Sequence, residues 1–416
     1  MTRMMRTHLD TLGSHVAIIG GGASGVLMAV HLLSQPGAAC RVTLVEGRNM
    51  LGCGIAYSTD DPQHLLNTRA QNMSAFPGDP DHFRRWLEGR DPAAEPASFV
   101  SRPTYGAYLA GLLAPWQSGP GAARLSCIRG TCLRIGDHGT HLSVHLDDGR
   151  VLRADRAVLA TGHVLPDPDP EGLLSGAWEP LGELDPDGPV IIIGTGLSMV
   201  DQVLSLKNRR HQGRIIALSR RGLMPREHAP VSPMAIPAGD LPLGAQASVL
   251  MRWARALARQ AERGGGTWRD AVDGIRPHVR DLWASLPPAE RARFLRHAAP
   301  WWDIHRHRMP PQSAGRIADA LASGQLHLMR GRFVQARRGA DGRPVARIAV
   351  PVGGLRDIPA CRIIDCRGIR RALRQHGSPV VRAMMARGQA RLDPLQIGLD
   401  VAPDCTVRDA VGERIE

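Results

Sequence analysis

One segment near the start of the chain constrains the fold more than any other. An apolar run at residues 16–19 leads into Gly20-x-Gly22-x-x-Gly25, then a helical stretch, then a second apolar run that ends in Glu46. A strand, a glycine turn, a helix and a strand in this order form the β-α-β unit that binds a dinucleotide. We expect Gly20 to permit the tight turn, Gly22 to let the backbone approach a pyrophosphate, and Gly25 to let the helix pack closely on the strand.

The acid at the end of the second run completes this pattern. The interval from Gly20 to Glu46 places a carboxylate where it can accept hydrogen bonds from both hydroxyls of a ribose. The unpaired N–H groups at the start of the helix face the phosphates. We therefore predict that FAD binds here and include Ala23 and Ser24, at the start of the helix, among the cofactor-binding residues.

A second unit of the same kind begins at residue 190. Its strand leads into Gly194-Thr195-Gly196, a helix and a strand that ends at Ser219-Arg220-Arg221. Arg220 follows Gly194 at the same interval at which Glu46 follows Gly20, so the spacing assigns Arg220 the position of Glu46. A carboxylate there would repel a 2′-phosphate, whereas a guanidinium pairs with it through two hydrogen bonds.

The second unit is therefore predicted to bind NADPH. The expected cofactor-binding residues are Gly194, Thr195, Gly196, Ser198, Arg220 and Arg221. Met199 stands where a third glycine or alanine is usual, which predicts a slightly larger distance between helix and strand.

The segments around the second unit suggest how the domains are arranged. A hairpin with an Asp148-Gly149 turn precedes an apolar strand that ends in Thr161-Gly162, and a hairpin and a strand ending in glycine also follow the second unit. This order resembles flavoproteins with two dinucleotide domains, and it adds Thr161 and Gly162 to the cofactor-binding residues. We expect an α/β fold with two Rossmann-like domains and β-meanders: residues 1–185 and 356–416 form the FAD domain, and residues 186–355 an inserted NADPH domain.

A helical insertion is expected at residues 222–310. It is rich in helix formers and holds five of the eight tryptophans: Trp253, Trp268, Trp283, Trp301 and Trp302. Such an insertion either covers the active site, or packs on the sheet or forms a subunit interface.

Several segments together resemble one family. They are GGGASGVL, LGCGIAYST, HLLNTRAQNMSAFPGDPDHFRRWL, VLATGH, IGTGLSMVD, ALSRRGLMP and FLRHAAPWWDIHRHRMPP. The chain is similar over residues 15–400 to bacterial FAD/NAD(P)-binding proteins that are distantly related to flavin-dependent N-hydroxylating monooxygenases. The resemblance implies non-covalent FAD, a pyridine nucleotide and a cytoplasmic redox enzyme, without naming a substrate.

The resemblance also implies site residues. The segment with Asn67, Asn72, Met73 and Ser74 would pass near the flavin, where Asn72 and Ser74 could hydrogen-bond the ring edge; the alternative is a polar loop that caps the next helix. The run His305-Arg306-His307-Arg308 suggests a site for a nicotinamide phosphate or a substrate carboxylate, or else a solvated basic face. Candidate catalytic residues are Asn72, Ser74, His305 and His307.

Typical family members have a C-terminal segment with no counterpart in this sequence. Family members continue beyond the strand that QIGLDV resembles into a final strand and a helix whose N-terminus faces the flavin pyrimidine, whereas this sequence ends at Glu416. From the resemblance alone, the completeness of the flavin pocket stays open.

Composition excludes several classes of function. The net charge of +13 invites nucleic acid, but the arginines are scattered and only five Phe and three Tyr can stack on bases. No run of about 18 apolar residues predicts a membrane span, no signal peptide is indicated, and no spacing of His, Cys and Asp predicts a metal site. We expect a cytoplasmic protein that binds a small-molecule substrate, and homo-oligomerisation stays open.

Two related enzyme classes are also disfavoured. Disulfide reductases need a pair of redox cysteines shortly after the first unit, and only Cys53 is there; the motif of Baeyer-Villiger monooxygenases is absent. The sequence favours an FAD-dependent oxidoreductase reduced by NADPH, in first place a monooxygenase of a small amine or amino-acid-like substrate. The alternatives are an NADPH-dependent flavin reductase or dehydrogenase, and a catalytically inactive dinucleotide-binding module that acts through a partner.

Overall fold

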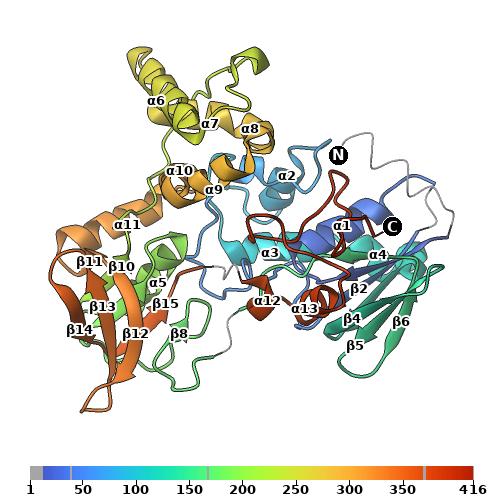
Figure 1. Cartoon of the computed structure of the whole chain (residues 1–416), viewed down its shortest axis with the longest axis horizontal. Helices are drawn as coiled ribbons and strands as arrows, with labels where there is room; N and C mark the ends of the chain where they lie inside the picture. The colour runs from blue at the N-terminus through green and yellow to red at the C-terminus, as the bar shows by residue number, and fades with distance from the viewer. Residues whose placement is uncertain (1–12, 38–39, 166–167, 369–371, 416) are drawn as a thin grey trace. The chain divides into compact units, whose positions relative to one another are not determined.

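The computed structural model describes residues 13–37, 40–165, 168–368 and 372–415. Two compact units make up the chain (Figure 1): residues 1–166 with 369–416, and residues 167–368. The sequence places the domain boundaries at 185/186 and 355/356. The second unit begins earlier and ends later than this, because strands outside those boundaries pair within its sheet.

The first unit is built on a four-stranded parallel sheet with the order β3-β2-β1-β7. The strands are β1 (His15–Ile19), β2 (Arg41–Glu46), β3 (Leu125–Arg129) and β7 (Arg156–Leu159), and helix α1 (Ala23–Leu33) connects β1 to β2. Residues of β1 alternate between two cores: Val16 and Ile18 pack in one, Ala17 and Ile19 in the other. Both faces are covered, which explains why the strand is apolar throughout.

Helices cover one face of this sheet and a β-meander the other. The first core contains α1 and α3 (Arg102–Gly111), and the second contains β4 (Cys132–Asp137), β5 (Leu142–Leu146), β6 (Val151–Ala154) and α13 (Pro379–Ala386). The hairpin predicted at Asp148-Gly149 is confirmed: β5 and β6 are antiparallel, and Gly149 has a φ of +87°. The shorter elements are η2 (Ala70–Asn72), α2 (His82–Glu88), α4 (Ala114–Gln117), η3 (Gly119–Arg124) and α12 (Leu373–His376).

The second unit repeats this plan. Its parallel sheet has the order β11-β10-β9-β15-β8, with β8 (Ser175–Gly176), β9 (Val190–Ile193), β10 (Ile215–Ser219), β11 (Leu326–Arg330) and β15 (Arg362–Asp365). One face packs against α5 (Leu197–Asn208) and α11 (Pro311–Ala322). The other packs against the meander of β12 (Arg332–Arg338), β13 (Pro344–Val350) and β14 (Gly354–Pro359). The predicted fold class, two Rossmann-like domains with β-meanders, is confirmed.

The predicted helical insertion lies between β10 and β11. It contains η4 (Ala238–Asp240), α6 (Ala247–Arg263), α7 (Trp268–Ile275), η5 (Arg276–His278), α8 (Val279–Ser285), α9 (Pro288–His297) and α10 (Ala299–Arg306). Figure 1 shows α6, α7 and α8 grouped away from the sheet of this unit. An ion pair attaches α7 to the segment after α10: the buried Arg308 donates to the two carboxylate oxygens of the partly buried Asp273 at 2.6 and 3.1 Å.

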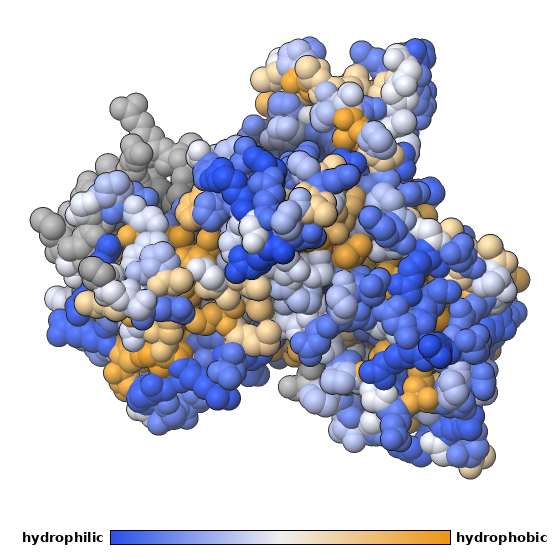
Figure 2. Space-filling model, turned by 180° about the vertical axis from the view of Figure 1, so that it is seen from behind, coloured by the Kyte–Doolittle hydropathy of each residue, from blue (hydrophilic) through white to orange (hydrophobic). Residues whose placement is uncertain are grey.

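The surface mixes polar and apolar residues. Figure 2 shows hydrophilic residues spread over the face that it draws, with hydrophobic residues in smaller groups between them. Among the described helices, none combines the length and the apolar character needed to cross a membrane.

Candidate functional site

The first glycine turn lies where β1 ends. Gly20 has a φ of +109°, and its N–H donates to the Val45 carbonyl at 2.8 Å. A Cβ on Gly20 would lie 2.2 Å from the carbonyl oxygen of Ala160, whose N–H in turn donates to Ile19 O at 2.9 Å. Both the backbone conformation and the close approach of the segment after β7 therefore require glycine here.

The other two glycines of the motif have different neighbours. A Cβ on Gly25 would lie 1.9 Å from Gly20 O, so the close packing of helix on strand is as the sequence predicts. Gly22 precedes α1, and a Cβ on it would lie 3.2 Å from the Cα of Gly54. Gly22 thus makes room for the loop that contains Gly54 as well as for any phosphate.

Glu46 is held beside this turn. Its Oε2 accepts from Gly21 N–H at 2.8 Å and its Oε1 from Arg48 N–H at 2.9 Å. A carboxylate has about four acceptor positions, so two backbone bonds fix its orientation and leave capacity for the hydroxyls of a ribose.

The remaining predicted residues of the first site surround the turn. The Cα of Thr161 would lie 3.2 Å from a Cβ on Gly20, and Gly162 follows with a φ of +60°. Ala23 and Ser24 form the first turn of α1, which has no side-chain cap and no acidic residue. Its N–H groups are thus available to an anion.

The segment around Asn72 is bonded to residues 96–98 as well as to its own loop, since the N–H groups of Ala70 and Gln71 donate to Ser98 O and Pro96 O, each at 3.0 Å. Asn72 ends η2 with an exposed side chain, and Met73 packs against the first core. The Ser74 hydroxyl lies 2.6 Å from Asp79 O and accepts from Phe76 N–H at 3.1 Å. Ser74 therefore organises the loop before α2, and the N-cap residue of that helix, Asp81, makes no side-chain capping bond.

The second glycine turn repeats two backbone hydrogen bonds of the first. Gly194 has a φ of +117°, and its N–H donates to Leu218 O at 2.7 Å. A Cβ on Gly194 would lie 2.4 Å from the carbonyl oxygen of Cys366, whose N–H donates to Ile193 O at 2.8 Å. Cys366 thus corresponds to Ala160, and Leu218 to Val45.

These bonds correct the position that spacing assigned to Arg220. The interval from Gly194 to Leu218 is one residue shorter than the interval from Gly20 to Val45. The counterpart of Glu46 is therefore Ser219. Each of these two residues accepts a backbone bond from a glycine of its edge-strand segment, Gly130 at 3.1 Å and Gly331 at 2.9 Å.

Ser219 joins the loop after β10 to the glycine turn. Its hydroxyl shares a hydrogen bond of 2.9 Å with the hydroxyl of Thr195, which is buried and also bonds to Leu223 O. It also accepts from Gly222 N–H at 3.0 Å. The loop that carries the two arginines is thus fixed at both ends.

The two arginines have different surroundings. Arg220 is exposed, and within the described part of the chain its guanidinium makes no hydrogen bond or ion pair. Arg221 donates to His297 O at 3.1 Å and to Arg296 O at 2.7 Å, at the end of α9. Arg220 is thus available to an external phosphate, whereas Arg221 has protein partners.

The remaining residues of the second glycine motif lie at the start of α5. Gly196 precedes the helix, and a Cβ on it would meet nothing within 4 Å. Ser198 is half-buried in the first turn. Met199 is fully buried in the core.

Most side chains of the basic run at residues 305–308 form hydrogen bonds within the protein. His305 Nδ1 donates to Trp301 O at 2.7 Å, and Arg306 donates to His307 Nε2 at 2.9 Å. Burial lowers the pKa of both histidines, so their neutral forms prevail at neutral pH. Arg308 is 1% exposed and committed to Asp273. The residues that were expected to bind an anion therefore have hydrogen-bond partners within the protein.

Sequence reasoning missed the loop that crosses the first turn. Gly52 has a φ of +79°, its N–H donates to Gly21 O at 2.8 Å, and a Cβ on it would lie 2.7 Å from Ala110 N. With Gly54 it brings backbone close to Gly22. The paired glycines of LGCG were the available signal.

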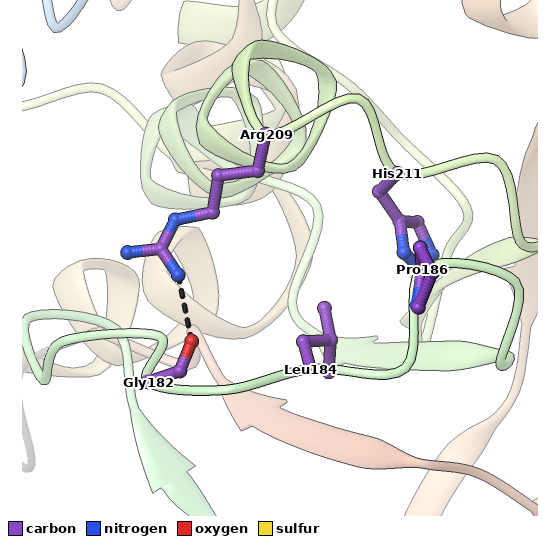
Figure 3. Close-up of a pocket in the computed structure, with 5 residues that line it drawn as sticks. All are labelled: Gly182, Leu184, Pro186, Arg209 and His211. Atoms are coloured by element: carbon purple, nitrogen blue, oxygen red, sulfur yellow. Dashed lines mark hydrogen bonds between the residues drawn. The ribbon is translucent and has the colours of Figure 1, made fainter.

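A hollow of about 340 Å³ lies at the other end of β9 (Figure 3). It is lined by Gly182, Leu184, Pro186, Arg209 and His211. These residues precede β9 or follow α5, whereas the glycine turn follows β9 and precedes α5. Arg209 donates to Gly182 O at 2.7 Å across the hollow, which is thus separate from the nucleotide site.

All seven cysteines are free, including the buried Cys53. In the described ranges, no group of three or more His, Cys, Asp or Glu side chains is placed to hold a metal ion.

The first glycine turn lies in a segment that is similar to a known family. Residues 17–164, which contain the first glycine turn and Glu46, match the model of a family described as FAD-NAD(P)-binding. This segment is similar to FAD-NAD(P)-binding domains. Among curated proteins, none matches the chain by sequence.

The fold is similar to that of several hydroxylases and monooxygenases. An ornithine hydroxylase from Pseudomonas aeruginosa aligns with a TM-score of 0.58 at 16% identity, over 95% of this chain and 91% of that one. An ornithine N-hydroxylase from Kutzneria sp. 744, solved with reduced FAD, NADP⁺ and L-ornithine, gives 0.54 at 16% identity, with coverage of 95% and 91%. A cadaverine monooxygenase from Erwinia amylovora, solved with FAD, gives 0.55 at 13% identity, with coverage of 96% and 86%. The likeness establishes the shared fold.

Proposed function

We propose that this protein is an FAD-dependent monooxygenase that NADPH reduces and that acts on the nitrogen of a small amine or amino-acid-like substrate. The observation that carries the proposal is the repeated glycine turn. One copy adjoins the carboxylate of Glu46, and the other is bonded to Ser219, which precedes an exposed arginine, Arg220, without a hydrogen-bond or ion-pair partner among the described residues.

The first turn fits FAD. Glu46 is oriented by two backbone donors and can accept from the ribose hydroxyls of the adenosine part. The uncapped start of α1 can receive the pyrophosphate, and Thr161 lies against Gly20 of the turn. A bound flavin would supply the two-electron and oxygen chemistry that side chains lack.

The second turn fits NADPH. Ser219, at the position of Glu46, presents a neutral hydroxyl that does not repel a 2′-phosphate, and Arg220 next to it presents an exposed guanidinium. The space around Gly196 leaves the backbone open to a pyrophosphate. Of the two arginines predicted to bind NADPH, Arg220 is the one that we propose for the phosphate contact.

The reaction type rests on the fold. The similar structures named above are hydroxylases or monooxygenases of ornithine and cadaverine, and the free Cys53 without a partner cysteine disfavours disulfide reduction. The proposed reaction consumes NADPH, a proton, O₂ and the amine, and gives NADP⁺, water and the N-hydroxylated amine. Asn72 and Met73 are proposed to contact the flavin, whereas Ser74, His305 and His307 remain candidates with local partners.

The test is a two-step oxidation experiment. The FAD-loaded protein is reduced with NADPH without oxygen and then mixed with oxygenated buffer in a stopped-flow instrument, with and without ornithine, lysine or cadaverine. A monooxygenase gives a transient near-ultraviolet absorbance that decays more slowly than it forms, and a hydroxylamine product with one amine. Direct reoxidation with one equivalent of hydrogen peroxide under every condition would instead indicate a flavin reductase. Failure of NADPH to reduce the flavin would indicate an inactive binding module.

A further inference from the structure

Arg221 follows Arg220 in the sequence but fastens the loop to a helix. Its two terminal nitrogens donate to the carbonyls of Arg296 and His297, the last two residues of α9. The last carbonyls of a helix have no intrahelical donor, so a guanidinium there supplies the missing hydrogen bonds and a favourable positive charge. The end of α9 is thus held by the loop that carries the proposed phosphate ligand.

The chain that leaves this loop is also attached to α10. Arg226 N–H donates to Ile304 O at 2.9 Å, and Met309 N–H donates back to Arg226 O at 2.8 Å. His228 N–H continues the pairing with Met309 O at 2.9 Å. Residues 219–228 therefore run from the glycine turn, through Ser219 and Thr195, to the ends of α9 and α10, all within the second unit.

We infer that Arg221 is a positioning residue that couples the 2′-phosphate site at Arg220 to the end of α9, so that NADP(H), but not NAD(H), orders residues 288–306. The inference rests on the proposed NADPH site. A phosphate held by Arg220 restrains the backbone of the loop, and the restrained loop holds Arg221 against the helix. NAD(H) has no 2′-phosphate and leaves the loop as it is. Because binding coupling is reciprocal, loss of the Arg221 contact weakens NADP(H) binding and spares NAD(H).

The experiment is hydrogen–deuterium exchange of the full FAD-loaded chain with saturating NADP⁺ or NAD⁺. In the wild-type protein, NADP⁺ slows exchange in residues 288–306 about fivefold more than NAD⁺ does, the lower end of usual coupling. In Arg221→Ala this difference disappears, and NADP⁺ affinity falls about fivefold while NAD⁺ affinity is unchanged. Arg221→Lys, which keeps one cationic donor, retains part of the difference. Arg280→Ala is the matched control, because Arg280 is exposed on α8 and has no hydrogen bond or ion pair among the described residues.

Two failures can be told apart. If the wild-type protein binds NADP⁺ with a full isotherm and yet shows no slower hydrogen exchange in residues 288–306, this result overturns the coupling and leaves the NADPH site in place. The same holds if Arg221→Ala keeps the slower exchange. If wild-type protein gives no NADP⁺ isotherm, the NADPH site is overturned and the coupling falls with it. If Arg221→Ala does not fold, Arg221→Lys and the comparison of NADP⁺ with NAD⁺ in the wild-type protein still test the coupling.

Discussion

Gly194 lies so close to Cys366 that a Cβ on the glycine would be 2.4 Å from the cysteine's carbonyl oxygen. Gly194 also has a φ of +117°, which disfavours every other residue. We predict that Gly194→Ala destabilises the second unit by about 3 kcal/mol or more. Urea unfolding followed by tryptophan fluorescence checks this, since the helical insertion of this unit holds five tryptophans. Gly196→Ala is the control, because its methyl group enters open space and should change stability by less than about 0.5 kcal/mol.

Gly196→Ala has a second, separate use. Its methyl group would occupy the space proposed for the pyrophosphate, which NADPH and NADH share. Both nucleotides should bind at least about tenfold more weakly, a loss of about 1.4 kcal/mol, with their ratio unchanged. Titration of the folded variant with each nucleotide gives the answer, and unaltered binding of both would remove the pyrophosphate from this turn.

Arg220→Ala tests nucleotide selection. A charge-assisted pair with a phosphate contributes about 1.5–3 kcal/mol, so NADPH should bind roughly tenfold to a hundredfold more weakly while NADH is nearly unaffected. Unfolding should not change, because the side chain is exposed and makes no bond with the described protein. Equal losses for both nucleotides would show that Arg220 serves the pyrophosphate or the fold.

His211 predicts a pH dependence of stability in the second unit. Burial lowers its pKa against the raising effect of Asp185 and Asp187, and in the described structure neither ring nitrogen has a hydrogen-bond partner. The folded state then binds fewer protons than the unfolded one. The stabilisation is complete above the unfolded value of about 6.5 and is lost as the pH falls through the lower folded value.

His211→Leu should therefore lose less stability than the wild type between pH 7.5 and 5.5, as measured by urea midpoints. The stability of His211→Leu should still depend on pH, because burial also lowers the pKa of His305 and His307. His297→Gln, at an exposed position, serves as the control. An identical pH dependence in His211→Leu and the wild type would contradict the account.

Local spacing was enough to predict much of the fold. The geometry of a β-α-β unit fixes the order of strand, turn, helix and strand, so the sequence predicts the tight turn at Gly20 and the close helix packing at Gly25. The register at the end of β10 was not predictable by counting, because the second connection is one residue shorter. Only the bonds of Leu218 and Ser219 show this.

The other features that the sequence did not predict depend on residues that are far apart in the chain. Nothing near Arg221 or Arg308 in the sequence shows that one caps α9 and the other pairs with Asp273. The extent of the second unit depends on β15, which pairs with β8 and β9 across long stretches of chain. Gly22 also has a second neighbour, Gly54, so Gly22→Val would disturb the loop as well as FAD.

The most direct test of the central claim is the absorption spectrum of the purified, FAD-loaded protein before and after NADPH is added without oxygen. The account predicts oxidised flavin bands that bleach with one equivalent of NADPH, much faster than with the same concentration of NADH. A protein that retains no flavin, or a bound flavin whose spectrum stays unchanged with excess NADPH, would contradict it.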